Sequence, residues 1–130
     1  MREILFRGRQ EDNGEWVYGR LLADDVIVPK GQEFYTPHNI LDSALHAYTV
    51  LTETVGQYIG LKDKNGKKIF EGDIVRNPET SDVGAICFEP NTATFVIEFD
   101  SIIVNFYDYN NVDVEVIGNI YDNSIANNQK

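Results

Sequence analysis

Short strand-like runs that follow one another along the chain, with turn residues between them, limit what this protein can fold into. In residues 112–116, VDVEV, valine alternates with Asp113 and Glu115, which predicts a strand with one apolar and one charged face. Residues 83–90 and 92–99 are two further runs on either side of a Glu-Pro-Asn turn. Turn signals recur about every eight to twelve residues, so we expect a mainly β protein.

The N-terminal third predicts an antiparallel meander. Residues 1–22 have the pattern of a hairpin, because Asn13-Gly14 tolerates the positive φ angles of a tight turn and residues 16–22 alternate with a period of two. Residues 24–36 predict a second hairpin around a Pro-Lys-Gly turn.

One short helix of about ten residues is expected after this meander. Thr36 is a suitable N-cap and Pro37 a suitable first helical residue. Apolar residues then recur at intervals of three and four, namely Ile40, Leu41, Ala44, Leu45 and Tyr48.

The rest of the chain predicts five or so strands in a small SH3-like or related β-barrel that begins near Gly56. We therefore expect an N-terminal β lobe with a short helix over residues 1–55, a C-terminal barrel lobe over 56–123 and a flexible polar tail over 124–130.

Charge and composition narrow the function classes. The net charge is −10, and residues 91–130 hold one basic and six acidic groups, so direct nucleic-acid binding is disfavoured for want of a basic stripe. Cys87 is the single cysteine, which excludes an intramolecular disulfide and fits a reducing cytosol. No apolar stretch approaches a membrane span, and residues 1–7 are too short a run for a secretory signal. We expect a cytoplasmic protein without cofactors or membrane contact.

The segment 60–75, GLKDKNGKKIFEGDIV, is interpreted mainly as structural. Gly60, Gly72 and Asp73 are expected to form turns, with the carboxylate accepting backbone N–H bonds. An EF-hand calcium loop is disfavoured because its first ligand position would be Leu61. A third hypothesis makes the loop a protein-contact surface, formed by Lys62, Lys64, Asn65, Gly66, Lys67 and Lys68.

Other chemistry has weaker support in the sequence. His38 and His46, eight residues apart, could share one side of a helix, but no third metal ligand is evident nearby. Cys87 lies in an apolar run, which favours a buried structural thiol over a nucleophile. Four aromatic residues could stack on bases, although core or interface packing is favoured: Phe95, Phe99, Phe106 and Tyr107.

Three motifs in order carry a family resemblance: REILFRG at residues 2–8, TVGQYIGLKDKNGKKIFEGDIV at 54–75 and VEVIGNIYDN at 114–123. In this combination the chain resembles the YopX family of phage and prophage proteins from residue 2 to about 123. The resemblance implies a phage-borne cytoplasmic protein that forms a homo-oligomer, and it supplies no catalytic residues.

We expect a non-enzymatic, self-associating protein-interaction module in the bacterial host cell, whose partner is another copy or a host or phage protein. One alternative is an acidic decoy that imitates a phosphate backbone to occupy a host DNA-binding protein. The other is an enzyme or small-ligand binder with a pocket between the lobes.

Overall fold

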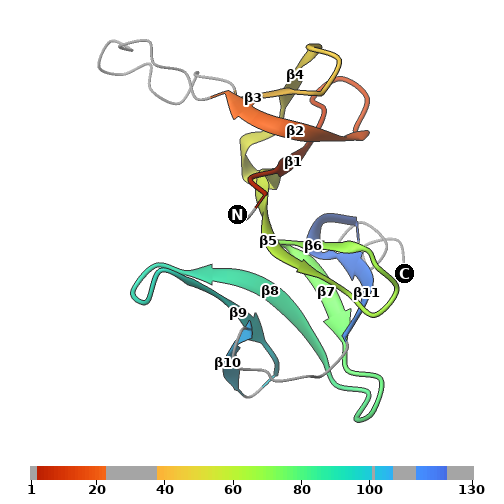
Figure 1. Cartoon of the computed structure of the whole chain (residues 1–130), viewed down its shortest axis with the longest axis vertical. Coiled ribbons are helices and arrows are strands. Elements are labelled where there is room, and N and C mark those ends of the chain that lie inside the picture. Colours follow the sequence, from red (N-terminus) through yellow and green to blue (C-terminus); the bar gives the residue numbers. More distant parts are fainter. Residues whose placement is uncertain (1–2, 23–37, 101, 107–113, 123–130) are drawn as a thin grey trace. The chain divides into compact units, whose positions relative to one another are not determined.

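The computed structural model describes residues 3–22, 38–100, 102–106 and 114–122 (Figure 1). Its contacts divide the chain into two compact units, Met1–Gln57 and Tyr58–Lys130. The prediction of a mainly β protein is confirmed, since antiparallel strands dominate both units. The expected hairpin at 24–36 and the expected flexible tail at 124–130 lie outside the described residues.

The first unit begins with the predicted hairpin. Strand β1 (Phe6–Arg9) pairs with β2 (Trp16–Leu22), and Gly14 in the connecting turn has a φ of +72°. The side chain of Asn13 accepts a hydrogen bond from the backbone N–H of Glu15, which stabilises the turn from within. Strand β2 then pairs with β3 (His38–Leu41), and β3 with β4 (Ala47–Val50).

The sheet of the first unit curls back on itself. Beyond the end of β1, Gln10 forms a bridge with Val50, the backbone N–H of Glu11 donates to the carbonyl of Thr49, and that of Leu51 donates to Arg9. One end of β4 is thereby hydrogen bonded to β3 on one side and to the end of β1 on the other. Ile40 and Val50, both fully buried, form the apolar centre of this unit, while helix η2 (Thr52–Thr54) follows β4 as a single 3-10 turn.

The prediction of a helix after Thr36 is wrong. Ile40 and Leu41 belong to β3, Tyr48 belongs to β4, and the residues between them form a tight turn, while Thr36 and Pro37 lie outside the described residues. The helical spacing of the apolar residues did not reflect a shared buried face, because Ile40 is fully buried whereas Leu45 is 77% exposed.

Asp42 supplies the physical reason for the turn. Its side-chain Oδ1 accepts hydrogen bonds from the backbone N–H groups of Ala44 and His46, and Leu45 adopts a φ of +66°. Aspartate side chains compete in this way with the backbone bonds of a helix. A hairpin therefore forms where the apolar spacing suggested helix.

Strand β5 (Gly56–Lys62) runs from one unit into the other. Its first residues, Gly56 and Gln57, pair with β1, and its remainder pairs with β6 (Lys68–Phe70). The register between β5 and β6 shifts around Gly60, whose φ of +95° is accessible to glycine without steric cost.

The second unit contains a five-stranded antiparallel sheet in the order β10-β9-β8-β7-β11 (Figure 1). The strands are β7 (Asp73–Arg76), β8 (Val83–Glu89), β9 (Thr94–Glu98), β10 (Ile103–Asn105) and β11 (Glu115–Asn119). Strands β8 and β9 form the hairpin expected around the Glu-Pro-Asn turn. Within the described residues the edge strands β10 and β11 do not pair, so the closed barrel that the sequence suggested is not observed.

One face of this sheet carries the core of the second unit. Its buried members are Ile59, Ile69, Val75, Ile86, Phe95, Ile97 and Val114. Val116 packs against this core, as the alternation of VDVEV predicted, and Glu115 pairs with Arg76 at 3.2 Å instead of pointing only to solvent. Val112 and Asp113 of the same motif lie outside the described residues.

Gly19 of β2 lies so close to the backbone of Leu41 on β3 that a larger residue there should destabilise the protein. A Cβ atom at this position would collide with the backbone carbonyl of Leu41, which cannot move without breaking the pairing of the two strands. We expect Gly19→Ala to lower the free energy of unfolding by about 1–3 kcal/mol in urea denaturation. Ala47→Val, which adds methyl groups at an exposed site of the same sheet, should change it by less than about 0.5 kcal/mol. Equal effects of the two variants would contradict this packing.

Candidate functional site

The segment that follows Gly60 folds around the carboxylate of Asp63. Its Oδ1 accepts hydrogen bonds from the backbone N–H groups of Asn65 and Lys67, both at 2.8 Å, and its Oδ2 accepts one from Val116 at 3.0 Å. Asp63 is only 8% exposed. Because Val116 lies 53 residues further along the chain, this one side chain both shapes the turn and attaches it to β11.

Burial alone would raise the pKa of Asp63, but the backbone N–H groups of Val116, Lys67 and Asn65 outweigh burial, and the pKa is lowered. The ionised carboxylate is therefore the form that the fold stabilises. Its oxygens are already directed at protein N–H groups, which leaves them poorly placed to bind calcium. Within the described part of the chain, no group of three or more His, Cys, Asp or Glu residues is arranged to hold a metal ion.

The residues proposed as a contact loop lie mostly at the surface. Lys62, Lys64, Asn65, Gly66 and Lys67 are exposed. Lys68 is half-buried, with its ammonium 5.4 Å from the centre of the Tyr58 ring, and the Lys64 ammonium lies 4.0 Å from Glu115. Three of the four lysines are thus open to solvent, and a protein-contact surface at this loop stays a prediction.

The second corner of this segment is formed as a structural turn. Gly72 has a φ of +93°, and its N–H donates to the carbonyl of Ile86. The buried carboxylate of Asp73 accepts a hydrogen bond from the N–H of Phe70 at 2.7 Å. Both residues thus connect β6, β7 and β8.

The histidines are not arranged as on a helix. His38 is the first residue of β3, and His46 lies in the turn before β4, where its Nδ1 is 3.8 Å from Asp42 Oδ2. The half-buried thiol of Cys87 has a raised pKa, first because of burial and then because of the negative charges of Glu98 and Glu71. A raised pKa disfavours the thiolate that a nucleophile requires.

The aromatic residues serve the core. Phe95 is buried, and Phe99 and Phe106 pack against the same cluster, while Tyr107 lies outside the described residues. These rings are consequently not exposed together as a stacking platform for bases.

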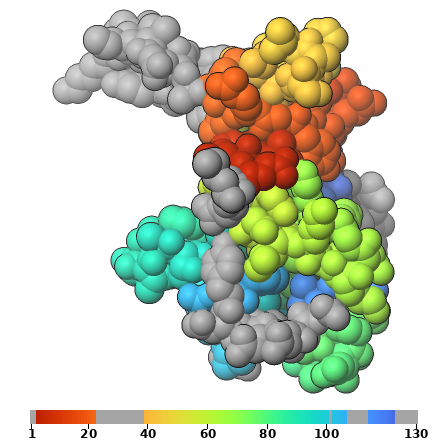
Figure 2. Space-filling view, in the orientation of Figure 1, coloured from red at the N-terminus to blue at the C-terminus, as the bar shows by residue number. Residues whose placement is uncertain are grey.

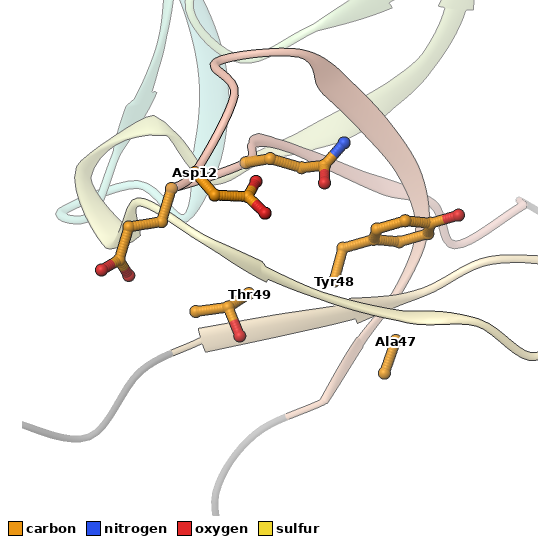
Figure 3. A pocket seen from close by; sticks show the side chains of 6 residues that line it. Asp12, Ala47, Tyr48 and Thr49 are labelled. Carbon is orange, nitrogen blue, oxygen red and sulfur yellow. The ribbon is translucent and has the colours of Figure 1, made fainter.

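The structure places a pocket of about 510 Å³ in the first unit, at the outer edge of β4 (Figure 3). Figure 3 shows Asp12 on one side of the hollow, opposite Tyr48 and Thr49 on the strand. The complete lining is Gln10, Glu11, Asp12, Ala47, Tyr48 and Thr49.

The pocket is polar and negatively charged. Glu11 and Asp12 are exposed acids, and Tyr48 donates a hydrogen bond to Asp42 Oδ2 at 3.2 Å. The hydrogen bond from the backbone N–H of His46 is the main cause of a lowered pKa at Asp42. This arrangement suits a cationic or hydrogen-bond-donating group better than an anion.

This pocket was not predicted from the sequence. The acids flanking Asn13-Gly14 were visible as part of a turn, but Tyr48, on the other side of the pocket, was assigned to a helix. The two sides of the pocket are more than thirty positions apart in the sequence. No local pattern could have joined them.

The fold defines a two-unit antiparallel β protein. The family model described as YopX protein matches residues 5–125, which is most of the chain. The chain therefore belongs to the YopX family. A search of curated proteins found no matching relative. In the described residues no helix is both long and apolar enough to cross a membrane.

The Asp63 network generates a prediction about stability and pH. In Asp63→Asn an amide N–H₂ would replace one acceptor oxygen, so at least one backbone N–H would lose its partner. We expect the free energy of unfolding to fall by about 1–3 kcal/mol at pH 7, measured by urea denaturation. Glu79→Gln, at an exposed position, is the matched control.

The sign of the pH dependence follows from the lowered pKa. The stabilisation from Asp63 is fully present above its unfolded pKa of about 3.8, and it is lost as the pH falls through the lower folded pKa. The difference between wild type and Asp63→Asn should therefore shrink in acid below that range. A difference that stays constant from neutral to strongly acidic pH would contradict the role of the carboxylate.

Proposed function

We propose that the chain is a non-enzymatic protein-interaction module that associates with copies of itself. The observation that supports this is the exposed apolar edge of the five-stranded sheet. Ile103, the first residue of β10, is 61% exposed, Ile102 just before it is 58% exposed, and no described strand pairs with the outer side of β10. Strand β9 and its neighbour β10 are drawn in blue in Figure 2.

An apolar edge strand presents unpaired backbone groups together with water-exposed apolar side chains, so it is a template for pairing with another chain. Two copies that join such edges extend both sheets and remove the exposed isoleucines from water. The negative net charge of −10 would limit non-specific aggregation while leaving this edge available.

We place this assembly in the cytoplasm of an infected or lysogenic bacterium, with phage proteins or host proteins as further partners. The support is the resemblance of the three motifs to a phage and prophage family, together with membership of the YopX family.

The proposal is tested by size-exclusion chromatography with light scattering. The wild type should have a mass of at least twice the 14.8 kDa of one chain. Ile103→Lys should shift the protein toward the monomer, because a charge on an edge strand opposes pairing. Val83→Lys is the matched control, since Val83 is 46% exposed on β8, an inner strand of the same sheet. A wild type that stays monomeric at all concentrations would overturn the proposal.

A further inference from the structure

The outer edge of β4 carries backbone groups that no described residue uses. The hydrogen bond from the Asp42 N–H to the His46 carbonyl shows which opposite residues of β3 and β4 are hydrogen bonded to each other and which are not. Because bonded and non-bonded pairs alternate in antiparallel strands, Tyr48 and Val50 direct their backbone groups toward β3. Ala47 and Thr49 direct theirs outward, and the bond from Glu11 N–H to the Thr49 carbonyl agrees with this phase.

The neighbouring chain leaves this edge after a single bridge. Gln10 pairs with Val50, and the chain then turns back toward β2, as the bonds from Gln10 N–H to Glu15 and from Gly14 N–H to Gln10 show. Ala47 has Leu41 of β3 as its ladder partner, and on its outer side no described residue pairs with it. The N–H and C=O of Ala47 and the N–H of Thr49 are therefore directed toward the side of the strand where the pocket of Figure 3 lies.

We propose that this pocket binds an extended, positively charged peptide segment that adds as a short strand to the edge of β4. The inference rests on the proposed function, because it names the class of partner that an interaction module would take. Strand addition provides main-chain hydrogen bonds, and the pockets beside the strand provide side-chain selectivity.

The charge of the pocket selects the peptide. Glu11 and Asp12 supply the two carboxylates that line the pocket. A lysine or arginine in the added strand would meet these carboxylates, whereas an acidic segment would be repelled. Three outward backbone groups fit a contact of only a few residues, so the recognised segment is short.

Binding is measured by isothermal titration with three capped synthetic heptapeptides. The first alternates lysine with valine, the second has glutamate in place of lysine, and the third is the lysine peptide with N-methyl groups on all its backbone nitrogens. Only the first should bind, and its affinity should fall as salt increases. Equal binding of the acidic peptide would overturn the charge selection, and equal binding of the N-methylated peptide would overturn strand addition.

Amide hydrogen exchange locates the contact. The lysine peptide should slow exchange at the amides of Ala47 and Thr49. The amide of Tyr48, which already faces β3, should not change and serves as an internal reference. Protection confined to other strands would overturn the assignment of the site.

Two variants test the two parts of the site separately. Ala47→Pro removes an outward N–H at the first position of an edge strand, where proline is tolerated, and should weaken binding about tenfold or more. Glu79→Gln, at an exposed position of the other unit, should bind like the wild type. The double variant Glu11→Gln, Asp12→Asn keeps the strand edge intact and should lose most of the salt dependence. Circular dichroism establishes that each variant is folded.

Measuring self-association in parallel separates this inference from the proposed function. If the wild type assembles but the lysine peptide does not bind, the strand-addition site is wrong and the assembly stands. If the peptide binds to a protein that remains a monomer, the assembly is wrong and the site stands. Ile103→Lys should bind the peptide as the wild type does, because β10 belongs to the other unit.

Discussion

Carboxylates that accept backbone N–H bonds determine where the strands of this protein end. Asp63 shows the effect most fully, since its two oxygens hold three N–H groups from two distant parts of the chain. Asp42 and Asp73 do the same at the β3–β4 turn and at the start of β7. Hydrogen bonds to a charged acceptor are stronger than neutral ones, and they compensate for burying the charge. Without them the turns would leave polar backbone groups unsatisfied beside an apolar core.

Local chemistry explains which parts of the fold could be predicted from the sequence. The hairpin at Asn13-Gly14 and the β8–β9 hairpin depend on residues a few positions apart, and both were found. The helix expected after Thr36 failed because apolar spacing cannot distinguish one helical face from two short strands. Asp42 decides between them through its hydrogen bonds to Ala44 and His46, and a lone aspartate gives only a weak signal.

The candidate sites show the same limit. The segment after Gly60 stood out because it is rich in lysine, glycine and acids, but the structure uses its central acid to hold β11 and spreads its lysines over the surface. The pocket beside β4 has no such signal. It exists because the chain after β1 leaves β4 after the single bridge between Gln10 and Val50. This depends on how the strands pair and not on any sequence motif. Sites of this kind become visible only when register and hydrogen-bond phase are known.

The net charge of −10 includes several carboxylates that the protein uses for its own hydrogen bonds and ion pairs. Asp42, Asp63 and Asp73 maintain turns, and Glu115 is paired with Arg76 and lies near Lys64, so these carboxylates are not available to imitate a phosphate backbone. A decoy would need rows of free acids at regular intervals, and the acids of these turns are already engaged with the protein's own backbone. Glu11 and Asp12 differ, because they are exposed beside a strand edge that still offers hydrogen bonds. The carboxylates of Glu11 and Asp12 and the outward backbone groups of β4 would contact the same short peptide. This favours recognition of a basic strand over a general attraction to cations.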